Sequence, residues 1–500
     1  MIINWLKKLG ELLVKNAFMF FTISFILAMF LPRLVTQGMF PDGLLYSSIA
    51  RNLAIGKGSS WQPFFSHGYW LDFVKPIYYE NLPLMLIVES FFFRLFGEYW
   101  WVEKLFSFVV LGINLSLLIH IWNILSKTFV VLSGFAFLPL ILWYLMPTVI
   151  WGNPNNLMDS FQLIFCLLAT GILIRSAFQE DKFSWLFAFL GGLVIFIGVL
   201  AKGPVGFFPV VIPFLIYLLF KQKHTWRGFF LSAVSFLTAL LSIILLCYYN
   251  PSAYDFIKEY WFQRLNPVLN GTRSDADLRG LYHLKVLYLI LIEISPLIGL
   301  IVIIVLYRYF KKSIKYLEEE NRKLGILFLL IGLSATLPII ISSRQNAIYI
   351  IPALPFFALG FSFFILYFSA HSLKIKLASY KFKRPLAIFS FTFLIGTLIY
   401  CFNLFGTPGR EKDILSEISK FSKWIPRGES VLVGNNTNSD FSAHTYFQRF
   451  KEIEISNIPS KQHFMLIDKL KDSISGDLIK DLGKPKSIYQ GKIYTVYKFE

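Results

Sequence analysis

The sequence predicts an all-α polytopic membrane protein, with roughly eleven transmembrane helices in a range of about ten to thirteen, and a small extramembrane α/β domain at its C-terminal end. The first observation is composition, since 56% of the 500 residues are hydrophobic and only 16% are charged, against roughly 25% charged residues in soluble domains. The second is a mean hydropathy of +0.59, which is too high for one water-soluble core of this chain length. The third is that long apolar runs end at residue 404 and give way to short, mixed segments.

The basic residues are typical of membrane topology rather than of nucleic-acid binding. A net charge of +18 would suggest a nucleic-acid partner for a soluble protein. Here the lysines and arginines collect between apolar runs, as at 221–224 and 308–315. Cytoplasmic loops of membrane proteins have this bias, so we expect the bilayer, and no nucleic acid, as the partner.

Each predicted span is an apolar run near the length that about 30 Å of hydrocarbon requires. The candidate spans are 17–35, 104–125, 128–147, 155–177, 185–200, 203–220, 228–249, 283–306, 324–342, 347–369 and 386–404. The basic segments that should face the cytoplasm are the N-terminus, 126–127, 178–184, 221–227, 307–323 and 371–384. The loops 36–103 and 250–282 and the C-terminal segment then lie on the other side.

The apolar run 82–97 does not fit this alternation. Counting it as a span would reverse every later loop and place the basic clusters outside. We therefore interpret it as a helix that lies in, or dips into, the outer leaflet of the bilayer.

The last segment has its own pattern. Short strand-like runs occur at 431–433, 452–455, 464–467 and 493–497, with helical stretches near 410–424 and 440–449. This alternation predicts a small α/β domain. The expected division is a transmembrane domain at 1–404 and an external domain at 405–500.

Three carboxylates are placed at the same outer face by this topology: Asp42, Glu80 and Asp159. Ionisable side chains near the bilayer are costly and therefore candidates for function. Asp42 follows the first span, where it suits either a helix N-cap or a base that removes a proton from an acceptor. The sequence leaves both interpretations open.

The same face receives cations. Lys202 separates two apolar runs, and Arg344 lies between two spans. Lys202 is either a snorkelling anchor or a partner for a lipid phosphate. Arg344 is either an ordinary loop residue or, with its fork of donors, a phosphate ligand. The second external loop adds Arg264 and His283.

Four motifs in order carry a family resemblance. They are Pro41-Asp42-Gly followed by Tyr46 and Ile49-Ala-Arg51, then Tyr78-x-Glu80-x-x-Pro83-Leu84, then Leu200-Ala-Lys-Gly-Pro204, then Arg344-x4-Tyr349-x2-Pro352-x2-Pro355. This pattern resembles the glycosyltransferase C superfamily, nearest to the protein mannosyltransferase and lipid A aminoarabinose transferase branch. It covers roughly residues 15–360.

The resemblance implies an inverting transfer of a sugar from a polyprenyl phosphate carrier, on the non-cytoplasmic face. It implies catalytic roles for Asp42, Glu80 and Asp159, with Asp42 near the acceptor. It implies substrate-binding roles for the remaining matched residues, which are Tyr78, Lys202, His283, Arg344 and Tyr349.

One position departs from the family pattern. The lysine expected after the glutamate, where it would touch the carrier phosphate, is Asn81 here. A charge-assisted contact of about 1.5–3 kcal/mol is lost, so lipid A is not assigned as the acceptor. Glu80 and His283 are ligand types that suit a divalent zinc or manganese ion, although two residues do not define a metal site.

We therefore expect a glycosyltransferase whose donor is a polyprenyl-phosphate-linked sugar and whose acceptor is a lipid, glycan or protein. Usage rich in lysine, phenylalanine and isoleucine suggests a bacterial inner membrane, an undecaprenyl carrier and a periplasmic active site. The alternatives are a transporter or flippase of lipid-linked sugars, which predicts paired broken helices with midplane charges, and a non-catalytic envelope assembly protein.

Overall fold

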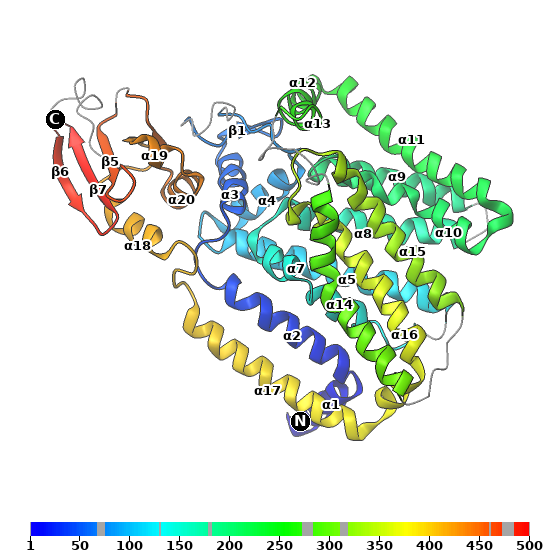
Figure 1. Ribbon diagram of the computed structural model, residues 1–500. Helices are drawn as coiled ribbons and strands as arrows, with labels where there is room; N and C mark the ends of the chain where they lie inside the picture. The colour runs from blue at the N-terminus through cyan, green and yellow to red at the C-terminus, as the bar shows by residue number, and fades with distance from the viewer. Residues whose placement is uncertain are drawn as a thin grey trace. The chain divides into compact units, whose positions relative to one another are not determined.

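The computed structural model describes residues 2–67, 76–129, 132–178, 183–272, 284–310, 319–459, 462–472 and 485–499. By their contacts these residues form two compact units. The helical unit comprises Met1–Pro32, Phe108–Asn153 and Met158–Asn403, and the mixed unit comprises Arg33–Ser107, Pro154–Leu157 and Leu404–Glu500. Figure 1 shows the helices and strands of both units.

Within the described residues, nine helical segments are long and apolar enough to cross a bilayer. They are Ala17–Leu34, Val102–Thr128, Met158–Phe178, Phe183–Ala201, Gln222–Tyr249, Lys285–Phe310, Glu319–Ile341, Ala347–Ser369 and Tyr380–Leu404. Nine of the eleven predicted spans are thereby matched, and the chain is a multi-pass membrane protein. The fold class predicted from the sequence is confirmed.

The helices that form these spans are α2 (Ala17–Leu34), α5 (Val102–Thr128), α8 (Met158–Phe178), α9 (Phe183–Ala201), α11 (Thr225–Tyr249), α14 (Lys285–Phe310), α15 (Glu319–Thr336), α16 (Leu354–Ala378) and α17 (Tyr380–Leu404). An amphipathic helix, α1 (Ile2–Lys15), precedes them. Figure 1 shows α2 and α17 side by side, where the rings of Phe21 and Phe389 lie 6.3 Å apart.

The predicted span 203–220 is built in an unexpected way. It begins as a 3-10 helix, η3 (Pro204–Val211), and continues as α10 (Ile212–Phe220). Pro209 and Pro213 cannot donate backbone hydrogen bonds, which disfavours a continuous α-helix. Because a 3-10 helix rises about 2.0 Å per residue, the two pieces together still cover roughly 30 Å.

The predicted span 128–147 is not one helix. It contains α6 (Phe137–Tyr144), which has eight residues, and the chain resumes as α7 (Pro147–Gly152). Met146 is extended, with ψ at 128°, because the residue before a proline avoids helical geometry. Pro147 therefore divides the segment.

Close helix packing in this unit depends on small residues in α9. A Cβ at Gly192 would lie 2.5 Å from the carbonyl oxygen of Ser235 in α11. Ser235 also donates its hydroxyl to the carbonyl oxygen of Ala188, at 3.0 Å. Small residues let membrane helices approach in this way, so α9 is fixed against α11.

The mixed unit holds a five-stranded sheet with the order β4-β3-β5-β7-β6. Its strands are β3 (Ser430–Val433), β4 (Glu454–Ser456), β5 (Phe464–Asp468), β6 (Pro485–Gln490) and β7 (Tyr494–Phe499). β3 is parallel to β4 and β5, whereas β7 is antiparallel to β5 and β6. The predicted strands occur, and β6 is an additional edge strand.

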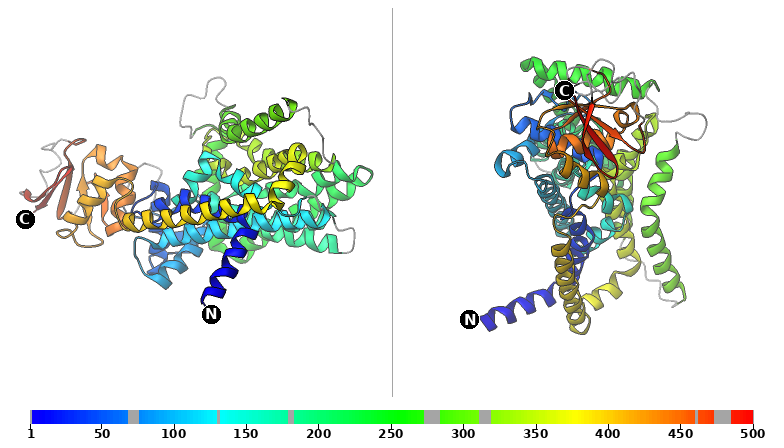
Figure 2. Two further views of the ribbon diagram at one scale, coloured as in Figure 1. Left: turned by 90° about the horizontal axis from the view of Figure 1, so that it is seen from below. Right: turned by 90° about the vertical axis from the view of Figure 1, so that its left-hand side faces the viewer.

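Two helices, α18 (Lys412–Phe421) and α20 (Phe441–Lys451), pack on one face of this sheet, as Figure 2 shows. Val431 and Val433 point into this core, and Leu432 between them belongs to a smaller cluster on the other face. This period of two is what a strand requires. Both faces of β3 are thus buried.

The core of the mixed unit also contains residues from the first predicted external loop. Met39 and Leu44 are buried in the same cluster as the sheet and its helices. Leu44 belongs to α3 (Pro41–Ala54), which packs against α20 and against α4 (Leu84–Phe96). Helix α4, with 13 residues, rises only about 20 Å, too short to cross the bilayer upright.

Candidate functional site

In the helical unit, a lysine and an aspartate predicted from the sequence meet. Asp159 lies in the first turn of α8, and Lys202 lies just after the end of α9. The ammonium group of Lys202 donates a hydrogen bond to Oδ1 of Asp159, and the side chains are only 15% and 5% exposed. A pair so shielded from water is stronger than a surface pair.

Two further side chains extend this cluster. The ammonium nitrogen of Lys202 lies 4.8 Å from the ring centroid of Tyr349, a cation–π distance. The guanidinium of Arg264 donates to the hydroxyl of Tyr349 at 3.3 Å. Tyr349 comes from the 3-10 helix η8 (Ala347–Ala353), and Arg264 comes from the single π-helical turn η5 (Trp261–Leu265).

The backbone beside Lys202 is fixed from two sides. Gln162, which is fully buried in α8, donates its side-chain amide to the carbonyl oxygens of Gly198 and Gly203, at 2.9 and 3.0 Å. Gly203 has φ at +152°, and a Cβ there would lie 2.5 Å from the hydroxyl of Tyr260. Only glycine suits this position, and Lys202 is thereby held in place.

We call Asp159, Lys202, Arg264 and Tyr349 the cation cluster. Lys202 and Arg264 contribute two cations to the cluster, and Asp159, which pairs with Lys202, contributes one carboxylate. The phenol of Tyr349 and the guanidinium of Arg264 add donors that can rotate or fork toward an anion. A group of this kind can bind a phosphate and stabilise negative charge that builds on it.

Arg344 lies in the helical unit between η7 (Leu337–Ile341) and η8, and it is half-buried. Its backbone N–H donates to the hydroxyl oxygen of Ser342 at 3.1 Å, and its carbonyl oxygen accepts from that hydroxyl at 2.8 Å. A tight local turn therefore fixes its backbone. Its role as a phosphate ligand stays a prediction.

In the mixed unit, Asp42 is the second residue of α3 and is half-buried. The N-cap position of this helix is occupied by Phe40, so the prediction that Asp42 is the N-cap residue is wrong. A carboxylate in the first turn is still favoured by the helix dipole. Its role as a base stays a prediction.

The start of α3 is held by the segment around Asn155. The backbone N–H of Phe40 donates to the side-chain oxygen of Asn155 at 2.9 Å. A Cβ at Gly43 would lie 2.2 Å from the carbonyl oxygen of Asn155. The glycine beside Asp42 thus permits this contact and positions the first turn of α3.

Glu80 and Tyr78 lie just before α4, where Tyr78 is buried and Glu80 is half-buried. Asn81, which stands in place of the family lysine, donates its side-chain amide to the hydroxyl of Tyr78 at 2.6 Å. The ring of Tyr78 meets that of Tyr46 edge to face at 6.3 Å. Asn81 therefore positions the tyrosine instead of supplying a charge.

Sequence reasoning missed Glu89, which is fully buried in α4. Asn156 donates its side-chain amide to Oε1 of Glu89 at 2.8 Å. Burial, with the nearby Glu103 second, raises the pKa of Glu89 well above its ordinary value. A lone glutamate in the apolar run 82–97 was the signal that could have identified it.

His283 lies outside the described residues, so its pairing with Glu80 stays a prediction. Among the residues that the structure describes, no group of three or more histidine, cysteine or acidic side chains could hold a metal ion.

No protein-family model and no curated protein sequence matches this chain. The structure resembles that of ArnT from Cupriavidus metallidurans bound to undecaprenyl phosphate, with 11% identity and a TM-score of 0.59 over 96% of this chain and 97% of that one. The apo form of that protein gives 10% identity and a TM-score of 0.60, covering 95% and 96%. An oligosaccharyltransferase from Archaeoglobus fulgidus, complexed with zinc and sulfate, gives 10% identity and a TM-score of 0.46, covering 86% and 64%. By its likeness to ArnT over nearly the whole of both chains, this protein has the glycosyltransferase C fold.

Proposed function

We propose that this protein is an inverting glycosyltransferase that uses a polyprenyl-phosphate-linked sugar as donor on the non-cytoplasmic face of a bacterial inner membrane. The observation that carries the proposal is the cation cluster of Asp159, Lys202, Arg264 and Tyr349. Its support from the comparisons is fold alone, together with the undecaprenyl phosphate bound to ArnT.

The chemistry of the donor explains why a membrane enzyme needs such a cluster. A polyprenyl tail dissolves in lipid, so its phosphate must be met by protein that lies within or beside the bilayer. Negative charge increases on the phosphate as its bond to the sugar breaks. Lys202 and Arg264 would stabilise that charge, with Asp159 holding Lys202 in position until the phosphate arrives.

In the proposed reaction, an oxygen or nitrogen of the acceptor attacks the anomeric carbon from the face opposite the phosphate. The bond between that carbon and the phosphate oxygen breaks, and its electron pair leaves with the polyprenyl phosphate. The acceptor loses one proton to a general base, for which Asp42 is our candidate. The acceptor is a lipid, a glycan or a protein.

Binding of undecaprenyl phosphate to the purified full-length protein tests the phosphate role directly. The expected result is saturable binding that undecaprenol, which lacks the phosphate, does not reproduce. Arg264→Gln should weaken it by about tenfold or more, the loss of a charge-assisted hydrogen bond. Arg322→Gln is the matched control, because Arg322 is 51% exposed and pairs with Glu319, which is also exposed. Equal binding of phosphate and alcohol would contradict the proposal.

Turnover is tested in a strain that lacks this protein. The intact masses of its surface glycolipids and glycoproteins should show one missing sugar, and the wild-type gene should restore it where Asp42→Asn does not. Transfer by purified protein in detergent then separates an enzyme from a transporter, because detergent micelles allow no transport. Restoration by Asp42→Asn would remove Asp42 from the base role.

A further inference from the structure

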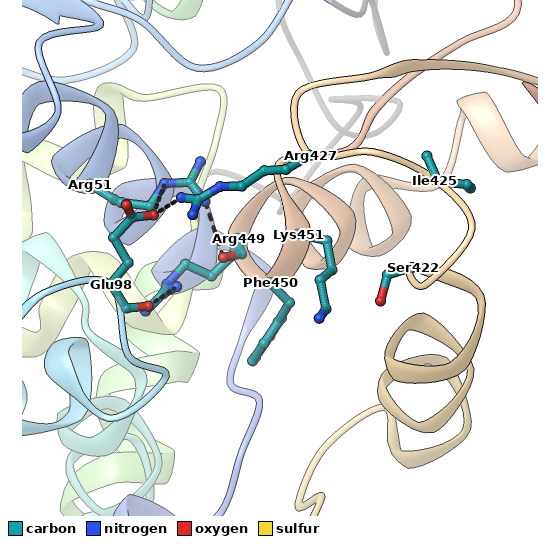
Figure 3. Close-up of a pocket in the computed structure, with 8 residues that line it drawn as sticks. All are labelled: Arg51, Glu98, Ser422, Ile425, Arg427, Arg449, Phe450 and Lys451. Atoms are coloured by element: carbon teal, nitrogen blue, oxygen red, sulfur yellow. Dashed lines mark hydrogen bonds and ion pairs between the residues drawn. The ribbon is translucent and has the colours of Figure 1, made fainter. Parts of the chain in front are cut away.

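A basic pocket lies within the mixed unit. Its volume is about 300 Å³. Figure 3 shows the side chains that line it, which come from α3, from the segment before α5, from the segment between α18 and β3, and from the end of α20. They are Arg51, Glu98, Ser422, Ile425, Arg427, Arg449, Phe450 and Lys451.

Ion pairs organise the arginines of this pocket. Arg427 pairs with Glu98 and, at 2.6 Å, with Glu452. Nε of Arg51 lies 3.5 Å from the Glu452 carboxylate. Arg449 is paired with Glu103 at 2.6 Å. The guanidinium groups are therefore fixed in position before any ligand arrives.

These ion pairs do not neutralise all of the positive charge in the pocket. Four cations and one carboxylate line the pocket, and the cations still exceed the carboxylates when Glu103 and Glu452 are added. The side chains of Arg51 and Arg449 are each 2% exposed, and Nε of Arg449 makes no hydrogen bond. Buried donors are nearly always paired in native proteins, and leaving one unpaired costs about 1–3 kcal/mol.

We propose that this pocket binds a phosphate-type oxyanion. Fixed guanidinium groups match the geometry of a phosphate better than a single ammonium does. A volume of about 300 Å³ is at the small end of ligand pockets, which span roughly 300–1,000 Å³. It therefore fits a phosphate group or a phosphorylated headgroup rather than a lipid chain.

Lys451 gives the cleanest test. It lines the pocket, is exposed, and takes part in none of the ion pairs described above. Lys451→Gln should therefore weaken anion binding by about two- to fivefold, the range of an exposed charge pair, with no loss of folding. Lys492→Gln is the control, since Lys492 is an exposed lysine of the same unit, 78% exposed and paired with Asp413.

The experiment is calorimetric titration of the detergent-purified full chain with inorganic phosphate, followed by the same titration with nanodiscs of phosphatidic acid or of phosphatidylcholine. Every titration is repeated with Lys202→Met, which removes a cation from the other cluster. Saturable phosphate binding that responds to Lys451 and not to Lys492 or Lys202 supports the proposal. The same pattern with phosphatidic acid alone supports it with a lipid headgroup as the source.

Arg427→Gln supplies a second variant, expected to weaken binding about tenfold or more. If it fails to fold, Lys451→Gln decides alone. Binding that does not saturate, that is equal in Lys451→Gln and wild type, or that follows only Lys202 overturns the proposal. None of these outcomes depends on sugar transfer, so this inference and the proposed function can fail separately.

Discussion

At the scale of single residues, variants of Lys202 and Asp159 can distinguish a role in sugar transfer from a role in stability. Lys202→Met leaves the Asp159 carboxylate, 5% exposed, without its partner, and an unpaired buried charge costs up to about 3–5 kcal/mol. Adding Asp159→Asn should recover most of this stability, because both charges are then gone. Sugar transfer should stay at least about 100-fold below wild type in both variants, since the phosphate still lacks its cation.

Melting temperatures and transfer rates of the single and double variants check this prediction. A double variant that regains both stability and activity would show that the pair serves folding alone.

Glu452 gives a prediction about pH. Burial alone would raise its pKa, but the hydrogen bond from Arg427 and the charges of Arg51, Arg427 and Lys57 together lower it to about 2. A depressed pKa contributes stability that is present above the ordinary value of 4.5 and is lost as the pH falls toward about 2. Glu452→Gln should therefore cost about 1.5–3 kcal/mol at pH 7 and progressively less below pH 4.5.

Thermal unfolding in detergent between pH 7 and pH 3 measures the difference. The control is Asp413→Asn, which breaks an exposed pair with Lys492 and should change stability little at any pH. A gap between Glu452→Gln and wild type that does not narrow on acidification would refute the assignment.

The sequence predicted site residues where a side chain is costly to place near the bilayer. Asp159, Lys202 and Tyr349 were all candidates, because ionisable groups and motifs at span ends stand out against apolar runs. The contact of Arg264 with Tyr349, and the two hydrogen bonds from Gln162, were not predicted. They depend on where η5 and η8 lie in space, which no local pattern encodes.

At the scale of elements, the start of α3 depends on Gly43. An alanine there would place its Cβ 2.2 Å from the carbonyl oxygen of Asn155, so the helix or the Asn155 segment must shift. Overpacking of this kind costs about 1–3 kcal/mol. Gly43→Ala should lower the melting temperature and, because Asp42 is the neighbouring residue, should reduce transfer as well.

Gly112→Ala is the matched control for that substitution. Gly112 lies within α5, and nothing lies within 4 Å of its added Cβ. Alanine is better than glycine in a helix by about 0.5–1 kcal/mol, so stability should be unchanged or higher. Equal behaviour of the two variants would mean that α3 does not need close contact with Asn155.

Elements were predictable where their pattern is long and uniform, and less so where it is short. Nine spans follow from apolar length alone. The break at Pro147 and the 3-10 start at Pro204 were missed because hydropathy does not register proline geometry. Strand β6 is mostly exposed, so it has none of the apolar alternation by which strands are recognised.

At the scale of the whole molecule, the sequence suggested that residues 405–500 form a domain tethered after the last span. By their contacts, residues 404–500 belong to one compact unit with 33–107 and 154–157. Sequence order cannot reveal this, because the packing of α3 against α20 joins residues about 400 positions apart. The division at residue 404 remains the predicted limit of the transmembrane spans.

Truncation after Leu404 tests how the mixed unit holds together. Met39 and Leu44, 2% and 0% exposed, would lose the sheet and helices that cover them. Arg51, also buried, would lose the carbonyl oxygens of Gln448 and Arg449 to which it donates. Because the apolar burial and these hydrogen bonds are lost together, residues 33–107 should become sensitive to protease, while the spans of the helical unit stay inserted and protected.

Limited proteolysis of the truncated and full-length proteins in detergent, with the fragments identified by mass spectrometry, checks this prediction. An intact fragment that contains residues 33–107 in the truncated protein would contradict the prediction. It would mean that this segment folds without the C-terminal strands and helices.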